Sequence, residues 1–211
     1  MFMASSMIHI SVANEINKII NKDRKSLLIG TIAPDISKHI GKTKLESHFL
    51  DDVKNDVPNL KRFLDKYKDY LDDDFVLGYY IHLYTDYLWF KYFIPDFFKD
   101  SYVYKLDGTK EYLPEGKAIE YIYNDYTNLN VNLIDEYDLE LDIFYEDIPE
   151  FKNIIEEIPM DKIQIIVDQA GIILENTKVV KPYVFDMKLV NNFIKLCKEY
   201  ILSDLKNLGV I

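Results

Sequence analysis

The chain has 211 residues, of which 48% are hydrophobic and 29% are charged. This is the composition of an ordinary globular protein, and the length is sufficient to bury a core, so extensive disorder is not expected. A net charge of −11 opposes nonspecific attraction to duplex nucleic acid or anionic lipid, and a single cysteine, Cys197, excludes an intramolecular disulfide and a cysteine-rich zinc site.

Helical periodicity dominates the chain, and few segments alternate as strands do. Apolar side chains recur every three or four residues on one side of several segments, which is typical of amphipathic helices. These segments are 8–21, 59–71, 161–175 and 186–207. A helix is also predicted over 116–136, although its asparagines weaken the pattern. Asp161 and Asp186 stand where N-caps are expected, and the sequence predicts an all-α protein.

The segments between these helices show turn signals. Gly30 to Pro34 and Lys38 to Lys44 resemble connections, and 105–117 is a predicted loop or hairpin with Asp-Gly and Pro-Glu-Gly turns. We therefore expect a single domain over 1–211, in which residues 1–100 form one half and residues 101–211 add a loop and the C-terminal helices.

Residues 75–94 form the most apolar stretch and approach the length that a bilayer requires. His82 and Asp86 lie near its middle, and the Asp alone costs about 2.5–3.5 kcal/mol on insertion scales, so a buried core helix is predicted instead of a transmembrane segment. The start of the chain lacks the basic and apolar regions of a signal peptide. These features favour a cytoplasmic protein.

His82 and Asp86 are four residues apart, so on a helix their side chains project from one face, about 5–6 Å apart at Cβ. A buried carboxylate without a partner is costly, and something must compensate it. The pair either satisfies itself and the backbone by hydrogen bonding, or it shares a metal ion.

Three more residues near the start are candidate metal ligands. Asp35 follows Pro34, His48 lies within SHFLDD, and His9 lies on an otherwise apolar helix. Each also has a structural interpretation: Asp35 as a helix N-cap, His48 as an exposed polar residue, and His9 as a core histidine with satisfied hydrogen bonds. A His/Asp set of this kind suits zinc, iron or manganese.

Four ordered blocks, MIHISVANEI, LIGTIAPDIS, ESHFLDD and FVLGYYIHLYTDYLW, together resemble the bacterial zinc-dependent phospholipase C family over about the first 95 residues. The resemblance implies the all-helical bundle that this family shares with fungal single-strand nucleases. It also implies that Asp35, His48, His82 and Asp86 hold one zinc, and that Asp86 bridges to a second zinc bound by His9.

By the same resemblance, the chain is a metal-dependent phosphoester hydrolase in which Asp35 also steers or deprotonates the attacking water. A small phosphoester or a lipid head group is the expected partner. Secreted members complete a third metal site with later histidines, a glutamate and a processed amino terminus, but this chain has no histidine after His82. The third site is therefore absent or rebuilt from carboxylates such as Asp125, Glu136 or Glu146.

Two alternatives follow from that departure. The metal is a structural clamp in a non-catalytic member, or the chain is an HD-type phosphohydrolase. The second normally requires an adjacent His-Asp dipeptide, which this sequence lacks. His39 shares a face with Asp35 if residues 35–39 are helical, but no block of the family requires it, and an exposed role is expected.

Overall fold

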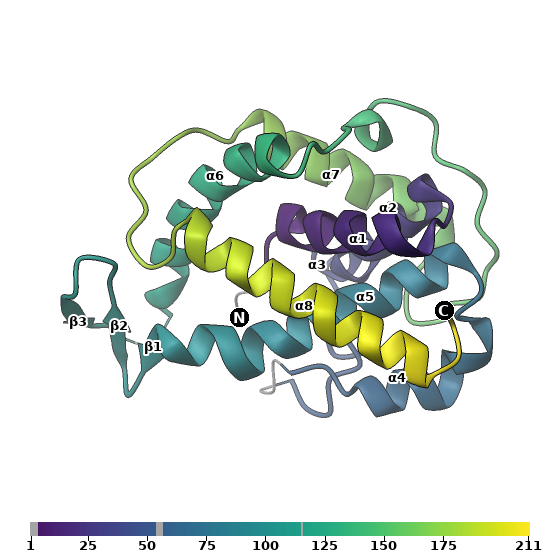
Figure 1. The fold of residues 1–211 in the computed structure, drawn as a ribbon, viewed down its shortest axis with the longest axis horizontal. Coiled ribbons are helices and arrows are strands. Elements are labelled where there is room, and N and C mark those ends of the chain that lie inside the picture. Colours follow the sequence, from purple (N-terminus) through teal and green to yellow (C-terminus); the bar gives the residue numbers. More distant parts are fainter. Residues whose placement is uncertain (1–3, 54–56, 115) are drawn as a thin grey trace.

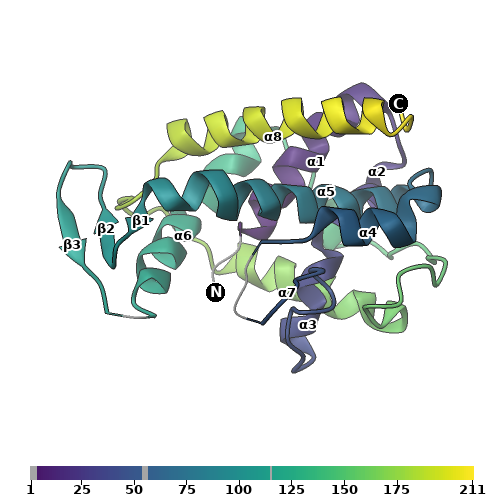
Figure 2. The same ribbon diagram turned by 90° about the horizontal axis from the view of Figure 1, so that it is seen from below.

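The computed structural model describes residues 4–53, 57–114 and 116–211 and is mostly helical, as predicted (Figure 1). The helices are α1 (Ser6–Ile20), α2 (Arg24–Ile32), α3 (Ile36–His39), α4 (Leu60–Tyr67), α5 (Asp74–Leu88), α6 (Ala118–Glu136), α7 (Ile163–Glu175) and α8 (Met187–Asn207). In both ribbon views α1 lies between α7 and α8, and Figure 2 shows these two helices on opposite sides of the molecule (Figures 1 and 2).

The predicted helices are confirmed at nearly the expected positions. Ser5 caps α1 by accepting a hydrogen bond from Ile8 N, and Asp186 caps α8 by accepting one from Leu189 N. The predicted cap at Asp161 is wrong, because this residue lies within the 3₁₀ turn Met160–Lys162, and α7 begins after it without a side-chain cap.

The predicted connection over residues 30–34 is wrong, because α2 and the 3₁₀ turn Ala33–Asp35 occupy it. Gly30 is a contact residue here rather than a helix breaker: a Cβ on it would lie 2.2 Å from the carbonyl oxygen of Phe75 on α5. Gly78 on α5 is the reciprocal case, since its Cβ would lie 2.0 Å from the carbonyl oxygen of Leu27. The two glycines therefore let the backbones of α2 and α5 approach closely.

The predicted connection over 38–44 is shorter than expected, because α3 includes Lys38 and His39. The predicted loop or hairpin over 105–117 is confirmed as the turn and second strand of a hairpin, with Gly108 at a φ of +82°. Antiparallel pairing of β1 (Phe98–Lys99), β2 (Tyr102–Tyr104) and β3 (Lys110–Tyr112) forms a small sheet that the all-α prediction missed. It projects from one end of the molecule (Figure 1).

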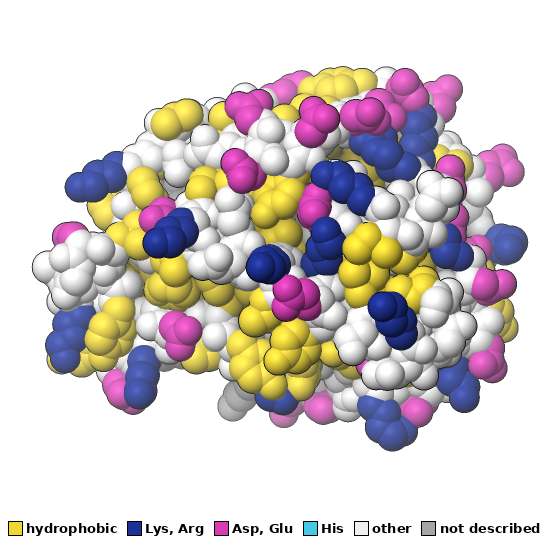
Figure 3. Space-filling model, viewed as in Figure 1, with side chains coloured by type: hydrophobic (Ala, Val, Ile, Leu, Met, Phe, Trp, Pro, Cys, Tyr) yellow, Lys and Arg dark blue, Asp and Glu magenta, His cyan; other side chains and the backbone are white. Residues whose placement is uncertain are grey.

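Helix α5 is buried along most of its length and passes into a π-helical turn at Trp89–Phe93. Trp89 is fully buried and packs against Phe93, Phe185 and Phe193, so it belongs to the core. Within the described ranges, none of the helices combines the length and apolarity needed to cross a bilayer. On the face drawn in Figure 3, lysines and arginines are interspersed with carboxylates and apolar side chains.

A buried carboxylate on α6 holds the segment before α8 in place. Asp125 on α6 is fully buried, and its oxygens accept hydrogen bonds from the backbone N–H groups of Tyr183, Val184 and Phe185 at 2.7–3.0 Å. The segment before α8 is thereby held against α6.

We expect Asp125→Asn to lower the free energy of unfolding by about 2 kcal/mol, because the amide retains only one acceptor oxygen for three backbone donors. Urea denaturation measures the change. The control is Asp135→Asn on the exposed side of the same helix, which should stay within about 0.5 kcal/mol of the parent. Equal effects of the two substitutions would contradict the role given to Asp125.

Candidate metal centre

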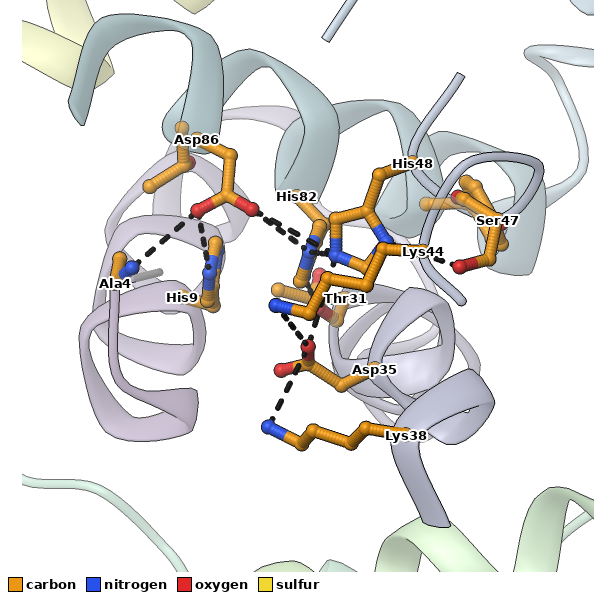
Figure 4. A network of polar contacts seen from close by, with 12 residues as sticks. Ala4, His9, Thr31, Asp35, Lys38, Lys44, Ser47, His48, His82 and Asp86 are labelled. Carbon is orange, nitrogen blue, oxygen red and sulfur yellow. Dashed lines mark hydrogen bonds and ion pairs between the residues drawn. The ribbon is translucent and has the colours of Figure 1, made fainter. Parts of the chain in front are cut away.

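All the predicted ligand residues meet in one buried cluster in the structure (Figure 4). Four segments of the first half of the chain supply them, and no side chain of the set is more than 2% exposed. Their donor atoms form two groups that could each hold a metal ion, and the groups share His82. The groups are His9, His82 and Asp86, and Asp35, His48 and His82.

Helices α1 and α5 position the first group. The imidazole of His9 stacks on that of His82, with ring centroids 3.8 Å apart and planes inclined by 11°. His9 Nε2 lies 3.3 Å from Asp86 Oδ1, and the backbone N–H of Ala4 donates to the same oxygen at 3.4 Å. Asp86 thus faces His9 with one oxygen and His82 with the other, at 3.4 Å.

The close crossing of α2 and α5 sets the orientation of His82. Its Nδ1 lies 2.7 Å from the carbonyl oxygen of Thr31 on α2. Because a carbonyl only accepts, Nδ1 carries the proton, and in the neutral ring Nε2 keeps a lone pair that faces the cluster. A backbone carbonyl on the remote nitrogen is a common support for a metal-binding histidine.

His48 comes from the turn that precedes α4. Its Nδ1 lies 3.0 Å from the hydroxyl of Ser47, whose carbonyl oxygen accepts a hydrogen bond from Tyr79 on α5. The prediction of an exposed His48 is wrong, because these contacts turn the ring inward to 2% exposure. Nε2 of His48 lies 3.2 Å from Nε2 of His82.

Several distances between donor atoms are close to those between the ligands of a zinc ion. With bonds of about 2.0–2.1 Å, the ligand atoms of a tetrahedral zinc lie about 3.3–3.4 Å apart. Nε2 of His82 is 3.4 Å from Asp86 Oδ2, and Nε2 of His48 is 3.7 Å from the same oxygen and 3.6 Å from Asp35 Oδ1. Nε2 of His48 therefore lies at approximately ligand spacing from one donor atom of each of His82, Asp86 and Asp35.

Several of these atoms lack hydrogen-bond partners among the described residues. Both ring nitrogens of His9, Asp35 Oδ1 and Asp86 Oδ2 are buried without one. Buried polar atoms are nearly always satisfied, so a concentration of unsatisfied donors and acceptors in one cluster requires an explanation. The interpretation of His9 as a satisfied core histidine is wrong, and the N-cap interpretation of Asp35 also fails, because this side chain makes no capping hydrogen bond.

The protonation states are those of metal ligands. Burial lowers the pKa of His48 to about 4, and burial together with the neighbouring His82 lowers the pKa of His9. Burial alone would raise the pKa of Asp86, but its contacts with His9 and His82 outweigh it and bring that pKa below its usual range. At neutral pH His9 and His48 are therefore neutral and Asp86 is ionised, which are the forms that bind metals.

A cavity of about 450 Å³ opens beside Asp35, between the start of α1 and helices α3, α6 and α7. Lys38 and Lys44 line it, and their Nζ atoms lie 3.6 Å and 4.0 Å from Asp35 Oδ1 (Figure 4). Burial raises the pKa of Asp35, but the two lysines and His48 overcome this and hold it well below its ordinary value. The sequence prediction missed both lysines because their segment was interpreted as a connection.

The remaining sequence candidates lie outside the cluster. His39 is half-buried and belongs to neither donor group found in the described part of the chain. Asp125 holds backbone amides, Glu136 accepts from Asn191, and Glu146 pairs with Lys25. Within the described ranges, none of these three carboxylates joins a His/Asp group, so the rebuilt third site is not found there.

Comparisons with known proteins give no relative for this chain. No family model, no curated protein and no solved structure matches it. The resemblance to the zinc-dependent phospholipase C family therefore stays a prediction, and function has to be argued from the chemistry of the cluster and its cavity.

Proposed function

We propose that the buried cluster binds one or two zinc ions and that the protein hydrolyses phosphoester bonds, as the resemblance to the zinc-dependent phospholipase C family implies. The observation that carries this proposal is a set of five buried imidazoles and carboxylates at ligand spacing, one of which borders a cavity. Histidine nitrogen and carboxylate oxygen are preferred zinc donors.

When bound, paired divalent cations supply a lowered water pKa and neutralise charge on a phosphoryl group. In the proposed arrangement Asp35, His48, His82 and Asp86 would hold one ion, and Asp86 and His9 would hold a second. The Thr31 carbonyl keeps His82 in the binding tautomer. This support fixes the ligand geometry before metal arrives, which favours tight binding.

Asp35 is the proposed catalytic residue because it belongs to the donor cluster and also lines the cavity. Its low pKa keeps the carboxylate ionised, so that it can accept a hydrogen bond from an attacking water and orient it. Lys38 and Lys44 place two positive charges where the phosphoryl oxygens of a substrate would lie. The proposed partner is a phosphoester, either a small molecule or a lipid head group.

A structural metal clamp is the second candidate. It is favoured by the burial of His9, His82 and Asp86, which are all 0% exposed, and by the absence of a donor from the described second half of the chain. A clamp predicts metal without turnover, whereas a catalytic centre predicts both.

The test is a zinc-loaded assay on p-nitrophenyl phosphate and bis(p-nitrophenyl) phosphate. We expect turnover by the parent, a loss of about 100-fold or more in kcat/KM for Asp35→Asn, and no detectable turnover for His82→Ala. His39→Ala is the matched control and should retain the parent rate, because His39 lies outside both donor groups. Zinc retention without turnover of either ester would favour the clamp, and turnover that survives His82→Ala would place the chemistry elsewhere.

A further inference from the structure

We infer that the cavity beside Asp35 is built for a phosphomonoester whose organic part carries a hydrogen-bond donor, and that Lys38, Lys44 and Asn130 determine this specificity. The inference rests on the proposed function, since it names the substrate class of the same site. Two independent features of the cavity wall carry it: a pair of lysines and a buried amide oxygen without a hydrogen-bond partner among the described residues.

The first feature is the charge beside the cluster. Lys38 and Lys44 converge on Asp35 Oδ1, from α3 and from the segment that follows it (Figure 4). A phosphomonoester carries a charge close to −2 at neutral pH because its second pKa is about 6, whereas a phosphodiester carries −1. Two ammonium groups at one end of the cavity interact more strongly with the dianion. The pair therefore selects monoesters over diesters.

The second feature lies in the wall formed by α6. The side chain of Asn130 is 3% exposed and lines the cavity, and its Oδ1 has no hydrogen-bond partner among the residues that the structure describes. An unsatisfied buried acceptor is unfavourable in the empty protein, and a ligand that donates to it removes the penalty. A hydroxyl or amino group on the substrate meets that requirement.

The size and lining of the cavity agree with a small polar molecule. A volume of about 450 Å³ falls in the range of small-ligand sites, and Thr127, Asn176 and Thr177 add polar side chains to the wall. A hydroxylated alcohol esterified to phosphate fits these requirements. It occurs both as a soluble metabolite and as the head of a lipid such as lysophosphatidic acid, which keeps one free hydroxyl, so the test includes both sources.

The charge prediction is tested by calorimetric titration of the full zinc-loaded chain with methyl phosphate and dimethyl phosphate. We expect methyl phosphate to bind at least about tenfold more tightly, and Lys38→Met with Lys44→Met to abolish that preference. Lys42→Met, at an exposed position of the same segment, is the control and should leave it unchanged. Equal affinities of the two esters for the parent would overturn the inference.

The amide prediction is tested with glycerol 3-phosphate and n-propyl phosphate, which differ in their hydroxyl groups. The parent should prefer glycerol 3-phosphate about tenfold, and Asn130→Leu and Asn130→Ala should remove the preference while leaving affinity for methyl phosphate unchanged. Two variants are used so that the test still holds if one of them does not fold. An unchanged preference in both folded variants would remove Asn130 from the site.

Phosphatidylcholine vesicles that contain lysophosphatidic acid are the probe for a lipid substrate. Binding of soluble glycerol 3-phosphate with no gain from vesicles supports a soluble substrate, and tighter binding to vesicles supports a lipid one. Failure of the two proposals is distinguishable: selective binding of monoesters without hydrolysis defeats the hydrolase proposal alone, whereas hydrolysis without monoester selectivity defeats the inference alone.

Discussion

Replacing Gly78 with alanine should lower the free energy of unfolding by about 4 kcal/mol or more and weaken metal binding with it. The added Cβ would lie 2.0 Å from the carbonyl oxygen of Leu27 and 2.9 Å from the amide nitrogen of Thr31. Both atoms belong to the backbone of α2, so a side-chain rotation cannot relieve the overlap, and the two helices must separate. Separation removes the Thr31 carbonyl from His82 Nδ1.

Urea denaturation and metal analysis measure the two effects of Gly78→Ala. Gly171→Ala on α7 is the matched control, because its Cβ would meet only the Cβ of Phe144, at an ordinary 3.7 Å. Alanine favours a helix by up to about 1 kcal/mol over glycine, so this control should be neutral or stabilising. If the free energy of unfolding of Gly78→Ala were within about 0.5 kcal/mol of that of the parent, the close packing of α2 against α5 would not be required for stability.

The Asp86→Asn variant should purify with almost no metal, whereas the parent should retain one to two equivalents of zinc or a similar ion per chain. Asp86 directs one oxygen at His9 and the other at His82, and it takes part in both ion sites of the proposed arrangement, so losing its charge should weaken both. Asparagine keeps the shape of the side chain, which separates loss of metal from loss of packing. Elemental analysis of the purified proteins gives the stoichiometry.

A chelator distinguishes bound metal from adventitious metal in the same proteins. Metal at about a thousandfold over its Kd stabilises the folded state by about 4 kcal/mol, so chelation should lower the Tm of the parent by roughly 10 °C. The Tm of Asp86→Asn should not respond, and His39→Ala should behave as the parent does. A parent that holds no metal after reconstitution, with an unchanged Tm, would contradict the metal centre.

Part of the ligand cluster could be predicted because the spacing of its residues along the chain indicates which side chains share a helix face. The four-residue interval places His82 and Asp86 on one face of any helix, and the apolar surroundings predict that the helix is buried. The convergence of His9, Asp35 and His48 on that face is a long-range property, which spacing alone does not show. Only the order of the four blocks suggested it.

What the sequence prediction missed depends on close approach between distant segments. Gly30 has the local signature of a helix breaker, and only the backbone of Phe75 against it explains why α2 contains it. In the sequence Asn130 is only one of several weak helix formers in the predicted helix 116–136. Its proposed role depends on the cavity that it lines together with Lys38 and Lys44. The strands were missed because two or three residues carry too little alternation to detect.

The cluster and its cavity draw on different parts of the chain. Among the described residues, the members of the two His/Asp donor groups all lie between His9 and Asp86, while Tyr123, Asn130 and Ile173 on α6 and α7 line the cavity. Substitutions can therefore affect the metal donors and the cavity wall separately. Changes in α6 and α7 can alter the shape and polarity of the cavity while the donor set stays intact.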